Sequence, residues 1–79
     1  MQCWEYRTLW ASYERDAMRV RRLDGVELTD WTKGPSLIET LNQLGSEGWE
    51  LVHIISGGIN SPAELYLKRL ASLANAPRR

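Results

Sequence analysis

Apolar residues recur at helical spacing near the middle of the chain, directly after a polar start signal. They are Leu37, Ile38, Leu41 and Leu44. Positions three and four apart share one face of a helix, so this pattern predicts an amphipathic helix. Ser36 and Glu39 have the spacing of a capping box, in which each side chain accepts a hydrogen bond from the other residue's backbone N–H. We therefore expect the helix to begin at Ser36.

Two glycines compete to end this helix. A left-handed Gly48 places Trp49 next, where a Schellman cap brings an apolar residue against Leu44 in the last turn. Gly45 then lies inside the helix, at a cost of roughly 1 kcal/mol relative to alanine. We expect the helix to end at Gly48. We also expect the helix backbone to approach the sheet closely at Gly45, which would explain the missing side chain.

Alternating patterns before the helix predict strands. Over residues 3–10, one face is expected to carry Trp4, Tyr6, Thr8 and Trp10, and the other Cys3, Glu5, Arg7 and Leu9. A polar interval with Tyr13 and Glu14 follows. Asp24-Gly25 then separates the segments 18–23 and 26–28, which is typical of a type I′ hairpin. This hairpin sets Arg22 opposite Glu27.

The segment after the helix predicts two more strands. Residues 49–55 are expected to direct Trp49, Leu51, His53 and Ile55 to one face, and Glu50, Val52 and Ile54 to the other. A turn over 57–62 and a strand over 64–70 complete the pattern. Both faces of the 49–55 strand therefore contain apolar side chains, so burying one face leaves the other in need of cover.

These elements predict one α+β domain over residues 1–70. Its expected architecture is a small antiparallel sheet of four to five strands, in the order β-β-β-α-β-β, with one helix packed on one face. Residues 71–79 are expected to form a flexible or short helical tail. Residues 29–35 are expected to be a loop. Sequence alone leaves open the order of strands in the sheet and whether Trp31 packs inward.

Three segments carry a likeness to known domains: W-E-Y-R at residues 4–7, L-N-Q-L-G-S-E-G-W-E-L-V at 41–52, and Y-L-K-R at 66–69. In this order they resemble the small bacterial domains catalogued as DUF4177, a domain of unknown function. They cover about a quarter of the chain, and residues 11–35 have no counterpart. The resemblance implies a fold. It supplies no catalytic residues, because the family has no general activity.

Composition limits the classes of function. The 79 residues have ten basic and ten acidic side chains and a formal net charge of zero, so no global field attracts nucleic acid or an anionic membrane. A single cysteine, Cys3, excludes an internal disulfide. We find no secretory signal and no transmembrane pattern, and we expect a cytoplasmic protein without membrane contact.

The apolar faces predict a partner. One short helix covers one face of a sheet, so the aromatic face and part of the 49–55 strand need another cover. The candidate interface residues are Trp4, Tyr6, Trp10, Val52, Ile54 and Tyr66. We expect a homo-oligomer, with a dimer favoured, and a further protein or small apolar ligand as other occupants. The alternative is that the loop holding Trp31, or the tail, folds across this face.

A second hypothesis is a nucleic-acid-associated or regulatory accessory protein that binds through an arginine-rich hairpin. Its candidate contacts are Arg15, Arg19, Arg21 and Arg22, with Trp10, Tyr13 and Trp31 as stacking platforms. Nearby Asp16, Asp24 and Glu27 dilute the field. A charged hairpin that discourages strand addition explains the same residues, and the sequence disfavours nucleic-acid binding.

Catalytic chemistry has little support. Cys3 and His53 are the only thiol and imidazole, and no third group orients a base between them. We interpret His53 as a half-buried structural residue. Glu5, Glu50 and Glu64 are explained equally well as solvated strand residues or as carboxylates paired across the sheet. Ser56-Gly57-Gly58 leads into another strand, not a helix N-terminus, so it predicts no phosphate site. We predict no enzyme, no cofactor and no metal.

Overall fold

The computed structural model describes residues 2–15, 17–58 and 61–71. In chain order, its elements are β1 (Trp4–Glu14), β2 (Ala17–Leu23), β3 (Val26–Glu27), the 3-10 helix η1 (Trp31–Lys33), α1 (Leu37–Ser46), β4 (Glu50–Ser56) and β5 (Ala63–Leu70). The five strands form one antiparallel sheet, which confirms the predicted β-β-β-α-β-β order and the α+β class.

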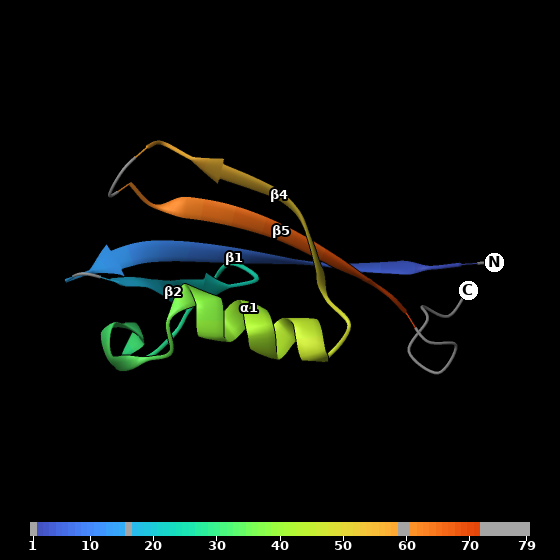
Figure 1. Ribbon diagram of the computed structural model, residues 1–79, viewed down its shortest axis with the longest axis horizontal. Coiled ribbons are helices and arrows are strands. Elements are labelled where there is room, and N and C mark those ends of the chain that lie inside the picture. Colours follow the sequence, from blue (N-terminus) through green and yellow to red (C-terminus); the bar gives the residue numbers. More distant parts are fainter. Residues whose placement is uncertain (1, 16, 59–60, 72–79) are drawn as a thin grey trace.

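The strand order in the sheet is β3-β2-β1-β5-β4, so the first and last strands of the chain lie at its centre (Figure 1). β1 is longer than expected. It continues beyond Trp10, past a shift in register where β2 has one extra residue, Arg21, and Tyr13 then pairs with Met18. The polar interval expected at Tyr13 and Glu14 is therefore strand. The error arose because cross-strand pairing, and not local polarity, sets where a strand ends.

The hairpin between β2 and β3 has the predicted geometry. Asp24 and Gly25 have φ angles of 52° and 85°, which is the left-handed pair that a type I′ turn requires. Arg22 pairs with Glu27 as expected, and Arg22 Nε lies 3.6 Å from Glu27 Oε1. Asp24 also binds β1 at Thr8, whose N–H donates to the Asp24 carboxylate at 3.1 Å.

Both ends of α1 form as predicted. Ser36 N–H donates to Glu39 Oε1 at 2.9 Å, and Glu39 N–H donates to Ser36 Oγ at 3.1 Å. At the other end, Trp49 N–H donates to the Leu44 carbonyl, and Gly48, with φ of 95°, donates to the Gly45 carbonyl. These two bonds define a Schellman cap.

The explanation expected for Gly45 is wrong. A Cβ built on Gly45 has no heavy atom within 4 Å, and the residue is exposed. The helix backbone therefore does not approach the sheet closely there. The reason is the rotation of the helix: Leu41 and Leu44 face the sheet, whereas Gly45 faces solvent.

The buried core lies on the helix-facing side of the sheet. Its members are Leu9 and Ala11 of β1, Val20 of β2, Leu44 of α1, Trp49, and Ala63, Leu65 and Leu67 of β5. Along this face, α1 packs near β2, toward the edge of the sheet that is distant from β4 (Figure 1). No residue of β4 belongs to the core, so this strand is held in place by its backbone pairing with β5.

The segment expected to be a loop contains η1, which packs against β2. Trp31 is half-buried there, with the guanidinium carbon of Arg21 5.1 Å from the centre of its ring. η1 therefore lies toward the edge of the sheet opposite to β4. The expected tail lies outside the described residues apart from Ala71, whose N–H donates to the Cys3 carbonyl at 2.8 Å. Within the described part of the chain, no helix has the length and apolarity to cross a membrane.

Candidate protein interaction surface

β4 is the outermost strand on one side of the sheet, and it is exposed along its whole length. Its four aliphatic side chains, Leu51, Val52, Ile54 and Ile55, are 44%, 51%, 48% and 52% exposed. Its only charged residue is Glu50, at the beginning of the strand. We call residues 50–56 the β4 edge. Its outer backbone groups have no partner among the described strands, and apolar side chains are exposed on both of its faces.

A bulge in β4 changes which residues share a face. The register with β5 shifts between Leu51 and His53, so Leu51 pairs with Leu67 but Ile54 pairs with Leu65. Leu65 and Leu67 both point into the core, so Leu51 and Ile54 lie on the helix side of the sheet. The expected grouping of Ile54 with Glu50 and Val52 on one face is therefore wrong, because the extra residue of a bulge breaks the period of two.

On the opposite face, His53 pairs with Tyr66 and Ile55 pairs with Glu64. His53 is exposed, which corrects the expectation of a half-buried structural histidine. The cause is its position: an edge strand outside the core has no second layer over it. His53 and Ile55 thus extend the aromatic face of the sheet toward the β4 edge.

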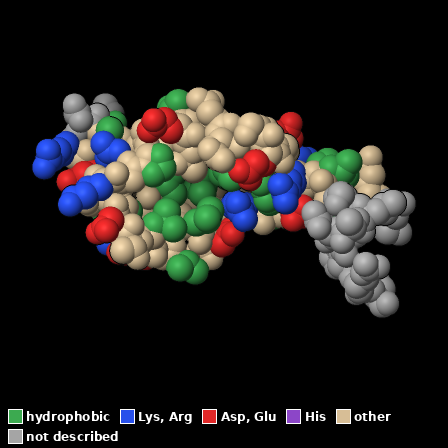
Figure 2. Space-filling view, turned by 90° about the horizontal axis from the view of Figure 1, so that it is seen from below, with side chains coloured by type: hydrophobic (Ala, Val, Ile, Leu, Met, Phe, Trp, Pro, Cys, Tyr) green, Lys and Arg blue, Asp and Glu red, His purple; other side chains and the backbone are tan. Residues whose placement is uncertain are grey.

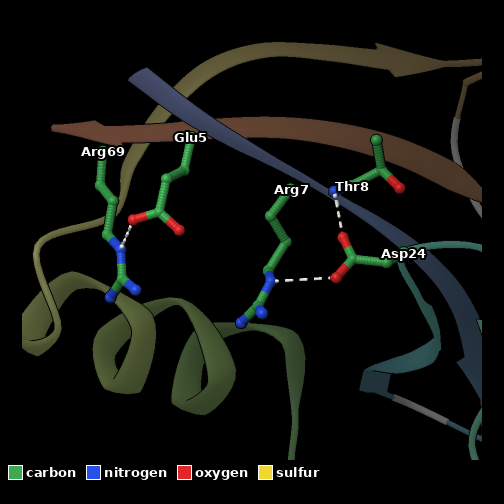
Figure 3. Close-up of polar contacts among 5 residues, drawn as sticks. All are labelled: Glu5, Arg7, Thr8, Asp24 and Arg69. Carbon is green, nitrogen blue, oxygen red and sulfur yellow. Dashed lines mark hydrogen bonds and ion pairs between the residues drawn. The ribbon is translucent and has the colours of Figure 1, made fainter. Parts of the chain in front are cut away.

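The start of β4 is fixed by Trp49, which is only 7% exposed. The guanidinium carbons of Arg7 and Arg69 lie 4.8 Å and 4.6 Å from the centre of its ring. Figure 3 shows Arg7 and Arg69 extending from the sheet toward α1, each beside a carboxylate. Arg69 Nε donates to Glu5 Oε2 at 2.9 Å, and Arg7 Nε lies 3.2 Å from Asp24 Oδ2.

These contacts hold the beginning of the strand in place. Stacked cation–π pairs of this kind are each worth about 0.5–2 kcal/mol, depending on burial. Arg69 also donates from Nη1 to the Glu47 carbonyl at the end of α1. The β4 edge is therefore anchored in a fixed direction, although its own side chains remain outside the core.

The predicted aromatic face is present on the side of the sheet opposite α1. Trp4, Tyr6, Trp10 and Tyr66 alternate with the buried residues of β1 and β5. Trp4 and Tyr6 are exposed, and Trp10 and Tyr66 are half-buried. A hydrogen bond with Glu64 raises the pKa of Tyr66 above its ordinary value, and the smaller effects of burial and the Glu64 charge act in the same direction.

Two of these rings already hold a cation of the same chain. Lys68 Nζ lies 4.3 Å from the centre of the Trp4 ring, and the Arg22 guanidinium carbon lies 5.7 Å from that of Trp10. This contact covers part of each ring, so Tyr6, at 70% exposure, is the most open aromatic side chain on the face. Val52 is the extra residue of the β4 bulge, so it has no partner residue on β5.

The opposite edge of the sheet has a different character. β3 consists of only two residues, and Glu27 carries a charge there. Beyond β3, the exposed side of β2 forms a bridge from Arg19 to Ser36, the residue that caps α1. Short length and charge both discourage strand addition. The long apolar edge among the described strands is therefore β4.

The four candidate arginines do not form one free basic surface. Arg21 and Arg22 share Glu27, at 3.3 Å and 3.6 Å. Arg19 Nη1 donates to the Gly34 carbonyl, and Arg15 Nε lies 4.0 Å from Glu14 Oε2. Figure 2 shows acidic side chains beside the basic ones around a central apolar area on the face seen from below. This arrangement offers little net positive charge to a phosphate backbone.

The groups considered for catalysis are apart. The strand register sets His53 level with Thr8, which is five residues along β1 from Cys3, or about 17 Å. Glu5 is paired with Arg69 on the helix side, whereas Glu64 lies on the aromatic face. In the described part of the chain, no three His, Cys, Asp or Glu side chains form a group that could hold a metal ion.

Two apolar residues of this surface, Leu51 and Ile55, were not among the candidate interface residues. A signal for them exists in the sequence: Leu51 to Ile55 contains one histidine and no charged residue, which is unusual for an edge strand. The edge position itself depends on pairing with β5, which is distant in sequence.

Comparisons of the chain with protein families, with curated proteins and with solved structures found no match. The resemblance to DUF4177 stays a prediction.

Proposed function

We propose that this chain is a self-associating protein-interaction module, and that a second copy covers its β4 edge. The observation that carries the proposal is the state of β4. An edge strand of seven residues has four aliphatic side chains about half exposed and a single charged residue. Contiguous exposed apolar surface on a sheet edge is typical of a binding site for another chain.

The chain itself offers no described segment that covers this strand. α1 and η1 both pack near β2, toward the edge of the sheet that is distant from β4. Each half-exposed aliphatic side chain gains about 1 kcal/mol when buried, which is modest against the entropy lost on association. We therefore expect an association that depends on protein concentration.

The neutral charge of the chain favours the same function, because no net repulsion keeps copies apart. A cytoplasmic location is part of the proposal, and the single cysteine is compatible with a reducing compartment. Nucleic-acid binding through the arginine hairpin is less well supported, since Arg21 and Arg22 share Glu27 and Arg19 binds the Gly34 carbonyl. The exposed Arg15 lies beside the opposite charge of Glu14.

Light scattering coupled to size-exclusion chromatography, from low to high micromolar protein, tests the proposal. We expect the average mass to rise from one copy toward two, and to do so equally at low and high salt, because apolar contacts are not screened. A mass of one copy at every concentration would contradict self-association.

A pair of matched variants locates the surface. Ile54→Lys places a charge on the β4 edge and is expected to shift the mass toward one copy. Ile38→Lys makes the same change on α1, at a position that is 65% exposed, and is expected to leave association unchanged. Equal effects of the two variants would show that β4 is not the contact.

A further inference from the structure

We propose that the second copy joins as an added antiparallel strand, β4 against β4, about a two-fold axis that passes through Ile54. The two five-stranded sheets then form one continuous sheet, with both helices on the same side. This inference rests on the proposed self-association and specifies its geometry. Three features of β4 support it: the free edge, the faces of the side chains and the position of the charge.

The backbone of β4 supplies the first step. Among the described strands, β4 pairs with β5 alone, so its other row of N–H and C=O groups has no strand partner there. A second copy provides an identical row. Antiparallel addition of one edge to its own copy requires a two-fold axis perpendicular to the sheet, and this axis keeps each face on its own side.

That symmetry limits the register. Residues opposite each other in an antiparallel pair must point to the same face. An axis between Ile54 and Ile55 would set these two residues opposite each other, but Ile54 lies on the helix side and Ile55 on the aromatic side. The axis must therefore pass through a residue and not between two residues.

Within the regular part of β4, we compare an axis through His53, Ile54 or Ile55. The apolar pairs favour Ile54. An axis at His53 brings two imidazoles together and sets Leu51 against Ile55, which point to opposite faces because of the bulge. An axis at Ile55 sets Ile54 against the polar Ser56. An axis at Ile54 sets Ile54 against its own copy on the helix side, and His53 against Ile55 on the aromatic side.

The charge on β4 agrees with this register. Glu50 lies four residues from Ile54, so the two copies of Glu50 are at opposite ends of the pair. At the rise of a strand they are about 27 Å apart, which exceeds the screening length of roughly 8 Å at physiological salt. No like charges of β4 oppose each other, and the centre of the contact is apolar.

Disulfide trapping tests the geometry, because a disulfide forms only where two Cβ atoms approach to about 3.5–4.5 Å. The native thiol is first removed with Cys3→Ser. In that background, Ile54→Cys is expected to give a covalent dimer under mild oxidation. A mixture of His53→Cys and Ile55→Cys chains is expected to give the mixed dimer in preference to either dimer of one kind.

Two further thiols serve as controls. Ile38→Cys, on the exposed face of α1, is expected to stay largely monomeric under the same oxidation. Tyr6→Cys reports on the other mode of dimerisation, in which the aromatic faces of two copies meet. Preferential trapping of Tyr6→Cys, or of Ile55→Cys alone, would overturn the proposed edge contact or its register respectively.

Light scattering on the same samples separates this inference from the proposed function. A dimer in scattering that no β4 cysteine traps overturns the added-strand geometry while self-association stands. A single-copy mass at high concentration overturns both.

Discussion

Two glycines at the end of α1 have opposite conformational needs although they are three residues apart. Gly48 has φ of 95°, in the region that side chains rarely adopt, and it donates the bond that closes the helix end. Gly45 is an ordinary helical position with open space where a side chain would be. The first glycine is required by backbone geometry, whereas the second only weakens the helix.

Alanine at these two positions is expected to change stability in opposite directions. Gly45→Ala should raise the free energy of unfolding by about 0.5–1 kcal/mol, because alanine restricts the unfolded chain and favours the helix. Gly48→Ala should lower it by about 1–2 kcal/mol, the cost of a side chain in a left-handed conformation. Urea unfolding of both variants measures the difference, and destabilisation by Gly45→Ala would contradict the open environment.

Glu39 gives α1 a dependence on pH. The hydrogen bond from the Ser36 backbone N–H lowers the pKa of Glu39, with smaller contributions from the Ser36 side chain and the charge of Arg19. The unfolded chain therefore takes up this proton more readily than the folded chain. The ionised carboxylate stabilises the fold above the unfolded pKa, and this stabilisation is lost as pH falls through the lower, folded pKa.

Glu39→Gln tests this dependence. We expect the variant to be less stable than the wild type at neutral pH, and the difference to shrink as the solution is acidified below the ordinary range of a glutamate. Urea unfolding at several pH values measures it. Glu47→Gln, at the other end of α1, is the control, and a difference for Glu39→Gln that grows on acidification would contradict the sign.

Among the elements, β4 is anchored at its first residues, and its side chains are exposed along its whole length. Trp49 fixes its start between α1 and the two arginines, and β5 holds one of its edges. A strand in this state is well ordered for binding but protects its own backbone on one side only. Its outward N–H groups exchange with solvent unless another chain covers them.

Amide hydrogen exchange of β4 is therefore expected to depend on protein concentration. Residues 53–56 should exchange more slowly at high than at low micromolar protein, whereas the amides of α1 should not change. In Ile54→Lys, the β4 amides should exchange at the fast rate at both concentrations. Exchange followed by NMR or mass spectrometry measures this, and protection that is independent of concentration would argue for cover from within the chain.

The sequence predicts elements best where the signal is local. The capping box at Ser36, the Schellman cap at Gly48 and the type I′ turn at Asp24 each depend on residues within five positions, and all three are confirmed. The bulge in β4 depends on how Leu51 and Ile54 meet β5, more than ten residues away. Sequence alternation alone therefore could not assign the faces of this strand.

For the whole molecule, self-association links stability to concentration. Only folded chains dimerise. Mass action therefore raises the melting temperature as protein concentration rises. We expect this rise for the wild type and Ile38→Lys, and a melting temperature independent of concentration for Ile54→Lys. Thermal unfolding followed by circular dichroism measures it, and identical behaviour of all three proteins would contradict the proposed contact.

The two edges of the sheet are unequal, and this sets the size that an assembly can reach. A chain with two long free edges can add copies at both ends and grow into a filament. Here, joining β4 to β4 uses the long apolar edge of each copy and leaves the two-residue, charged β3 at both outer ends. Growth by strand addition then terminates at two chains, so the asymmetry of the edges gives a finite particle from a surface that would otherwise polymerise.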